Sequence, residues 1–104
     1  MAEPERGEVW LVDLGYAAKV RPCLVLSIPA EIVDRALVTL VPHTTSTRGS
    51  RLEVNLRVRY LREGAFDVQN LVTIPHARLI RKLGSLMPGQ LAEVEDRVRF
   101  WLGL

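Results

Sequence analysis

The sequence predicts a mainly β protein, a small barrel of about five to seven short strands followed by one C-terminal α-helix. Its apolar runs are short and rich in β-branched residues, Gly and Pro separate them, and helical periodicity occurs only at the end. The chain has 104 residues, 48% hydrophobic and 25% charged, which is the composition of a globular protein and the length of one domain. We therefore expect a single domain over residues 1–104.

Five segments have the composition of strands. Residues 7–13 contain Val and Trp and lead into a glycine turn. Residues 23–26 and 36–41 are aliphatic runs, each stopped by a proline, and are expected to be buried strands. Residues 52–56 alternate apolar and polar side chains, which is typical of a half-exposed strand, and residues 68–74 are a fifth candidate.

The remaining segments predict one loop and one helix. Residues 43–50 are a polar cluster of Thr, Ser and Gly, which favours a loop. Pro88 can occupy the first turn of a helix, and apolar residues follow it at spacings of three and four. This stripe, which we expect to be buried, consists of Leu91, Val94, Val98 and Trp101.

Positive charge is concentrated in the middle of the chain. Residues 35–82 hold nine basic and three acidic side chains, net +6, whereas residues 1–34 are net −3 and residues 83–104 are net −1. Twelve of the fourteen cations are Arg, whose planar group of donors suits phosphate oxygens. The charge indicates a phosphate-bearing partner or, as the alternative, a solvated basic surface.

Several classes of protein lack their sequence signatures here. The longest uncharged apolar stretch, residues 22–30, contains two prolines and is far shorter than the roughly 20 residues that cross a membrane. The N-terminus is acidic and has no secretory signal, so we expect a cytoplasmic protein with no membrane contact. Cys23 is the only cysteine and is expected to be a buried, inert thiol. No cluster predicts a metal or another cofactor.

Two junctions between a strand and a loop carry the candidate chemistry. Arg21 follows a Gly-containing turn and begins a strand, and residues 42–48 leave the next strand as a Thr-rich segment. A strand end holds a side chain in place while the adjacent loop admits a ligand. These junctions are therefore the places where we expect a functional site.

Five blocks of the chain occur in a recognisable order. Residues 6–14 read Arg-Gly-Glu-Val-Trp-Leu-Val-Asp-Leu, and residues 21–27 begin Arg-Pro and continue as an apolar strand. Residues 41–47 form a strand with a Ser/Thr-rich exit, and residues 67–74 and 91–104 follow as later strands and a closing helix. Together they resemble the MazF/PemK-type toxins of bacterial toxin–antitoxin pairs over nearly the whole chain.

The resemblance implies an SH3-like barrel that forms a homodimer. It also implies a metal-independent endoribonuclease that cleaves single-stranded RNA, chiefly mRNA, and is inhibited by a cognate antitoxin protein. In this reaction a ribose 2′-OH attacks the adjacent phosphate and leaves a 2′,3′-cyclic phosphate and a 5′-OH. The family's catalytic arginine falls on Arg21, and its catalytic hydroxyl falls on Thr44 or, if the loop is shifted by one residue, on Thr45.

Proton transfer needs a further group, because arginine is a poor proton acceptor near neutral pH. His43 is adjacent to Thr44 and is a candidate general base, with a structural histidine as the alternative. Candidate contacts to RNA phosphates are Lys19, Arg48, Arg51, Arg78, Arg81 and Lys82.

Two other functions compete with the nuclease. The gyrase-poisoning CcdB-type toxins share the barrel without nuclease activity, and the end of this chain, residues 101–104, resembles their Trp- and Gly-containing terminus. A non-catalytic RNA-binding barrel would need only the basic middle block. We favour the nuclease because the Arg21 block and the Thr-rich exit match its family.

Overall fold

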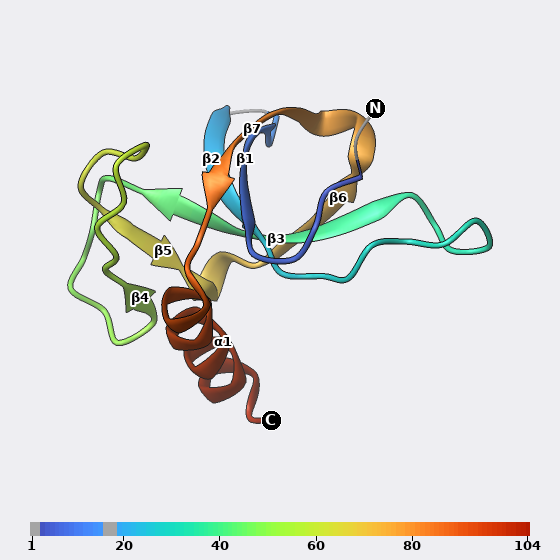
Figure 1. The fold of residues 1–104 in the computed structure, drawn as a ribbon. Helices are drawn as coiled ribbons and strands as arrows, with labels where there is room; N and C mark the ends of the chain where they lie inside the picture. The colour runs from blue at the N-terminus through green and yellow to red at the C-terminus, as the bar shows by residue number, and fades with distance from the viewer. Residues whose placement is uncertain (1–2, 16–18) are drawn as a thin grey trace.

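The computed structural model describes residues 3–15 and 19–104. The described elements are seven strands, two short 3₁₀ turns and one α-helix (Figure 1). In chain order they are β1 (Glu8–Asp13), β2 (Val20–Val25), β3 (Leu37–Thr44), β4 (Glu53–Val54), β5 (Ala65–Asp67), η2 (Val68–Asn70), β6 (Val72–Pro75), η3 (His76–Arg78), β7 (Leu79–Ser85) and α1 (Pro88–Leu102). The predicted mainly β fold with a C-terminal helix is confirmed.

The strands form one antiparallel sheet in the order β4-β5-β3-β2-β1-β7, and β6 pairs with β3 outside this order. Strand β3 is the centre of the fold, because it pairs with β2 along one edge and with both β6 and β5 along the other. The sheet curls, and α1 lies across the end that carries β4 and β5 (Figure 1). The C-terminal end of β3 is therefore held between two other strands.

The curled sheet has a core on each side. One core lies between the sheet and α1 and includes Leu24, Val41 and Phe66. The other lies inside the curl and includes Cys23 and Val25. Successive side chains of β2 point to opposite faces of the sheet, so this strand contributes residues to both cores. Where both of its faces are buried, at residues 23–25, its sequence is a continuous run of apolar residues.

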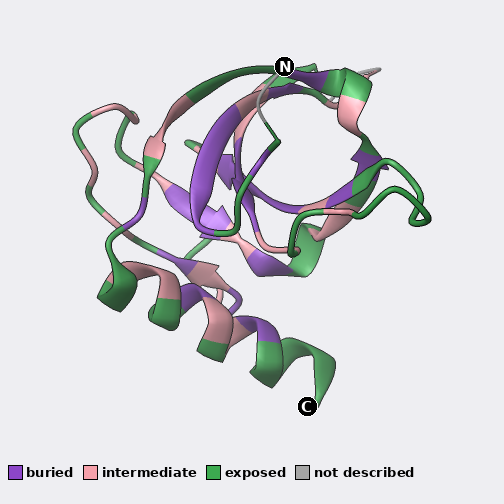
Figure 2. Ribbon diagram, turned by 45° about the vertical axis from the view of Figure 1, so that its right-hand side comes forward, coloured by how far each residue is buried: buried purple, intermediate pink, exposed green. Residues whose placement is uncertain are grey.

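Helix α1 begins at Pro88 and ends at Leu102, and Gly103 caps it with a φ of +72°, which favours glycine. Val94 and Val98 are buried as predicted. The predicted burial of Trp101 is wrong, since its side chain is 41% exposed. The last turn of the helix extends beyond the strands, and its residues are exposed (Figure 2).

The structure corrects several predicted strand boundaries. Pro42 does not stop β3. The next two residues, His43 and Thr44, were predicted as the start of the loop but remain in the strand, because β5 pairs with them. The predicted strand over residues 68–74 divides into η2 and β6, since Asp67 caps η2 by accepting a hydrogen bond from the Gln69 backbone N–H. The strand predicted over residues 52–56 shortens to β4.

Candidate active site

Strands β2 and β3 bring Arg21 and Thr44 to the same place. Their antiparallel register pairs Cys23 with Pro42. If this register is continued by two residues along each strand, Arg21 lies opposite Thr44. Because side chains two residues apart in a strand point to the same face, Arg21 lies on the face of Cys23 and Thr44 on the face of Pro42, which is one face of the sheet. Both residues line a cavity of about 390 Å³. The structure therefore brings together, in one cavity, the two strand–loop junctions that the sequence predicted as separate candidate sites.

Two polar residues that the sequence analysis did not select also line this cavity, Asp67 and Asn70. Asp67 is the last residue of β5, and its carboxylate accepts hydrogen bonds from the Gln69 backbone N–H and from the Asn70 side-chain amide. The signal in the sequence that could have identified Asp67 is its position as an Asp between an apolar strand and the turn that it caps. The cavity therefore holds a carboxylate together with a guanidinium and a hydroxyl.

The Thr44 hydroxyl is held by the backbone that follows it. Its Oγ1 accepts a hydrogen bond of 3.0 Å from the Ser46 N–H, which leaves the O–H free to donate to another group. Thr45 is exposed and lines the neighbouring cavities instead of this one. The hydroxyl that shares the cavity with Arg21 and Asp67 is therefore that of Thr44.

His43 borders the cavity, but its ring packs into the core. It is 3% exposed, and it contacts the cross-strand ring of Phe66 edge-on, with the ring centroids 5.1 Å apart. Its Nε2 is buried without a hydrogen-bond partner in the described part of the chain. Burial lowers the pKa of the imidazole, because the charged ring would lose its hydration.

We expect His43 to make the protein less stable in mild acid. Its pKa lies below 6.5 in the folded state and near 6.5 in the unfolded state, so the unfolded state binds protons more readily. The free energy of unfolding should therefore fall as the pH drops below about 6.5. Urea denaturation at pH 7.5 and 5.5 should show this fall for the parent protein, and His43→Leu should remove much of it.

The second histidine provides the control for this measurement. His76 lies near the surface, with its Nε2 3.1 Å from the Leu37 carbonyl oxygen, and His76→Leu should keep the pH dependence that His43 produces. An unchanged pH dependence in His43→Leu would contradict the assignment.

A second cavity, of about 670 Å³, adjoins the first and is basic. Arg21 lines both cavities, and Lys19, Arg62 and Arg81 line the second. Lys19 and Arg81 are predicted RNA contacts, whereas Arg62 was visible in the sequence only as part of the basic middle block. The structure therefore gathers four cations beside Thr44.

The other predicted RNA contacts do not line these two cavities. The guanidinium of Arg51 lies 5.0 Å from the centre of the Phe100 ring of α1, and Lys82 Nζ lies 3.1 Å from Glu8 Oε2. Arg48 belongs to a loop whose backbone N–H groups bond the Glu53 carboxylate, and the Arg78 side chain lies close to Gly15. The side-chain contacts of Arg51 and Lys82 indicate structural roles for these two residues.

Cys23 is buried in β2, as predicted. Burial raises the pKa of its thiol to about 12, although the neighbouring Arg21 acts to lower it. The thiol lies 3.6 Å from the Arg21 carbonyl oxygen, to which it donates a weak hydrogen bond. At neutral pH it is protonated and is a poor nucleophile.

Metal ligands are not grouped in the described residues: in 3–15 and 19–104, no three His, Cys, Asp or Glu side chains are placed to hold an ion. In the same ranges, no helix is long and apolar enough to span a membrane.

Comparisons with known proteins find similar sequences and similar folds. Residues 5–102 match the family model of the PemK-like, MazF-like toxins of type II toxin–antitoxin systems. A mycobacterial endoribonuclease, solved with its cognate antitoxin, is 29% identical, with 97% of this chain and 96% of that chain covered and a TM-score of 0.82. The Mycobacterium tuberculosis toxin MazF-mt6 is 29% identical; the alignment covers 93% of this chain and 97% of that chain, and the TM-score is 0.77. MazF from Deinococcus radiodurans is 26% identical, with both chains fully covered (100%) and a TM-score of 0.83.

Proposed function

The chain belongs to the PemK-like, MazF-like toxin family of type II toxin–antitoxin systems, and from this we propose that it is a sequence-specific, metal-independent endoribonuclease that cleaves single-stranded RNA. The observation that carries the proposal is the placement of Arg21 and Thr44 in one cavity beside a basic one. Cleavage of mRNA would stop translation and growth. The gyrase-poisoning alternative is not favoured by the family match.

In the proposed reaction, the ribose 2′-oxygen forms a bond to phosphorus and the bond from phosphorus to the 5′-oxygen breaks. The 2′-OH gives up its proton, the leaving 5′-oxygen gains one, and the products are a 2′,3′-cyclic phosphate and a 5′-OH. Negative charge increases on the non-bridging oxygens in the transition state. Donors held at those oxygens lower the barrier because they bind the transition state more strongly than the substrate.

Arg21 and Thr44 are the proposed donors. The Arg21 guanidinium presents a planar pair of N–H groups to the phosphate oxygens, and Thr44 adds its O–H. The hydrogen bond from Ser46 orients the Thr44 hydroxyl and favours it over Thr45 as the catalytic group. The packing of the His43 ring supports a structural role for that residue, while Asp67 brings a carboxylate into the cavity as another proton acceptor.

The basic cavity supports contacts to the RNA backbone from Lys19, Arg62 and Arg81. The same charge would attract an acidic segment of a cognate antitoxin, and a complex with a cognate antitoxin is described for the mycobacterial endoribonuclease. We also propose a homodimer in the cytoplasm as the active form. The proposed RNA contacts and the proposed antitoxin contact concern the same basic surface around Arg21.

The test is incubation of the purified protein with single-stranded RNA in EDTA. We expect products that end in a 2′,3′-cyclic phosphate and a 5′-OH, and light scattering of the same sample should give the mass of a dimer. Replacing the ribose at the cleavage site with deoxyribose should prevent cleavage, because the nucleophile is then absent. Gyrase inhibition without any RNA cleavage would contradict the proposal and favour the CcdB-type alternative.

A further inference from the structure

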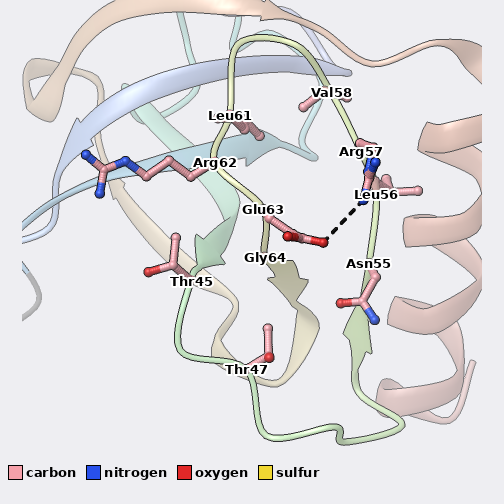
Figure 3. A pocket seen from close by; sticks show the side chains of 10 residues that line it. All are labelled: Thr45, Thr47, Asn55, Leu56, Arg57, Val58, Leu61, Arg62, Glu63 and Gly64. Atoms are coloured by element: carbon pink, nitrogen blue, oxygen red, sulfur yellow. Dashed lines mark hydrogen bonds and ion pairs between the residues drawn. The ribbon is translucent and has the colours of Figure 1, made fainter.

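A third cavity, of about 780 Å³, lies beside the proposed active site (Figure 3). The segment that leaves β3 lines one side through Thr45 and Thr47. The segment that joins β4 to β5 lines the rest, through residues 55–58 and 61–64. None of these lining residues except Thr45 was a predicted site residue.

This cavity continues from the basic cavity around Arg21. Thr45, Leu61 and Arg62 line both. In Figure 3 the Arg62 side chain points away from Asn55, out of the third cavity. An RNA strand with its phosphate at Arg21 can therefore pass Arg62 and place a neighbouring nucleotide in the third cavity.

The chemistry of the third cavity fits a base better than a phosphate. Arg57 and Arg62 are among its lining residues, and Glu63 brings a carboxylate into it, a hydrogen-bond acceptor that suits the amino group of a base and not a phosphate oxygen. This carboxylate lies 3.3 Å from the Arg57 guanidinium across the cavity, and both side chains are more than 80% exposed (Figure 3). An exposed ion pair of this kind contributes little to the stability of the fold. The Glu63 carboxylate can therefore leave Arg57 and bond to a ligand with only a small loss of free energy.

Aliphatic side chains also line the third cavity. Leu56, Val58 and Leu61 line it, and all three are partly buried against the core between the sheet and α1. Single-stranded RNA is recognised by proteins that cover the face of a base and hydrogen-bond its edge. The aliphatic side chains together with the Glu63 carboxylate and the Asn55 amide provide both kinds of contact.

We propose that the third cavity binds one base next to the cleavage site and selects bases with an exocyclic amino group over uracil. The inference rests on the proposed nuclease function. Glu63 accepts a hydrogen bond from the amino group of adenine, cytosine or guanine, and the Asn55 amide bonds the adjacent ring atom. Uracil has carbonyl oxygens in place of the amino group, and these repel the carboxylate.

The experiment uses an RNA pool with randomised sequence and sequencing of the cleaved ends. The parent protein should deplete uracil about tenfold at one position next to the cut. Glu63→Gln keeps the shape but lets the side chain donate to a carbonyl, so it should reduce that depletion to within about threefold and leave other positions unchanged. Asn55→Ala should weaken the preference at the same position.

Glu31→Gln is the matched control. It makes the same change on an exposed residue that lines none of the three cavities, and it should keep the parental preference. A parent without uracil depletion, or Glu63 and Asn55 variants with the parental preference, would overturn the base subsite and leave the nuclease function intact. A parent that cleaves no RNA would overturn the proposed function and this subsite with it.

Discussion

Replacing Arg21 with alanine should reduce RNA cleavage by roughly 10²- to 10³-fold while the melting temperature stays close to that of the parent protein. The large effect is expected because the guanidinium faces the phosphate oxygens on which charge increases. RNA binding should fall much less, since Lys19, Arg62 and Arg81 share the contacts to the backbone. Cleavage rates, RNA affinity and thermal unfolding can all be measured on one preparation.

Two further variants sharpen this test. Arg21→Lys keeps the charge but loses the planar pair of donors, so it should also cleave poorly. Arg35→Ala removes an exposed arginine from the loop before β3 and should cleave like the parent. If Arg21→Ala melted and cleaved RNA like the parent, the proposed site would be wrong and the gyrase-binding alternative would gain support.

Replacing Gly64 with alanine should destabilise the fold by about 3 kcal/mol or more. A Cβ at this position would lie 2.1 Å from the Thr44 carbonyl oxygen and 2.9 Å from Cε1 of the buried His43 ring. The carbonyl belongs to β3, which neighbouring strands hold on both edges, so it cannot move aside as a flexible side chain can. Urea denaturation at neutral pH measures the loss.

The same substitution should also reduce RNA cleavage by the protein that remains folded, because it displaces the backbone that carries Thr44. Gly89→Ala is the control, since a Cβ there would have no heavy atom within 4 Å. In the first turn of α1 this change should be neutral or stabilise the protein by up to about 1 kcal/mol. Similar unfolding free energies for Gly64→Ala and the parent would show that β3 adapts more easily than its packing indicates.

The fold was predictable where the signals are local. The apolar run of β1, the proline start of α1 and the buried positions Val94 and Val98 follow from composition and periodicity within a few residues. The pattern of apolar residues did not predict strands β5 and β7, because β5 has only three residues and four of the seven residues of β7 are exposed. Short or exposed strands depend on their partners, and the sequence pattern does not show those partners.

By itself the sequence determined the mainly β class, the closing helix and the family resemblance, and it predicted Arg21 and Thr44 as candidate catalytic residues. Only the tertiary structure decided that these two residues line one cavity, that the His43 ring packs into the core, and that Asp67 and Arg62 border the site. The reason is the register of the strands. Neighbouring residues of one strand point to opposite faces, while residues far apart in the chain meet across two strands, and long-range packing sets that alignment.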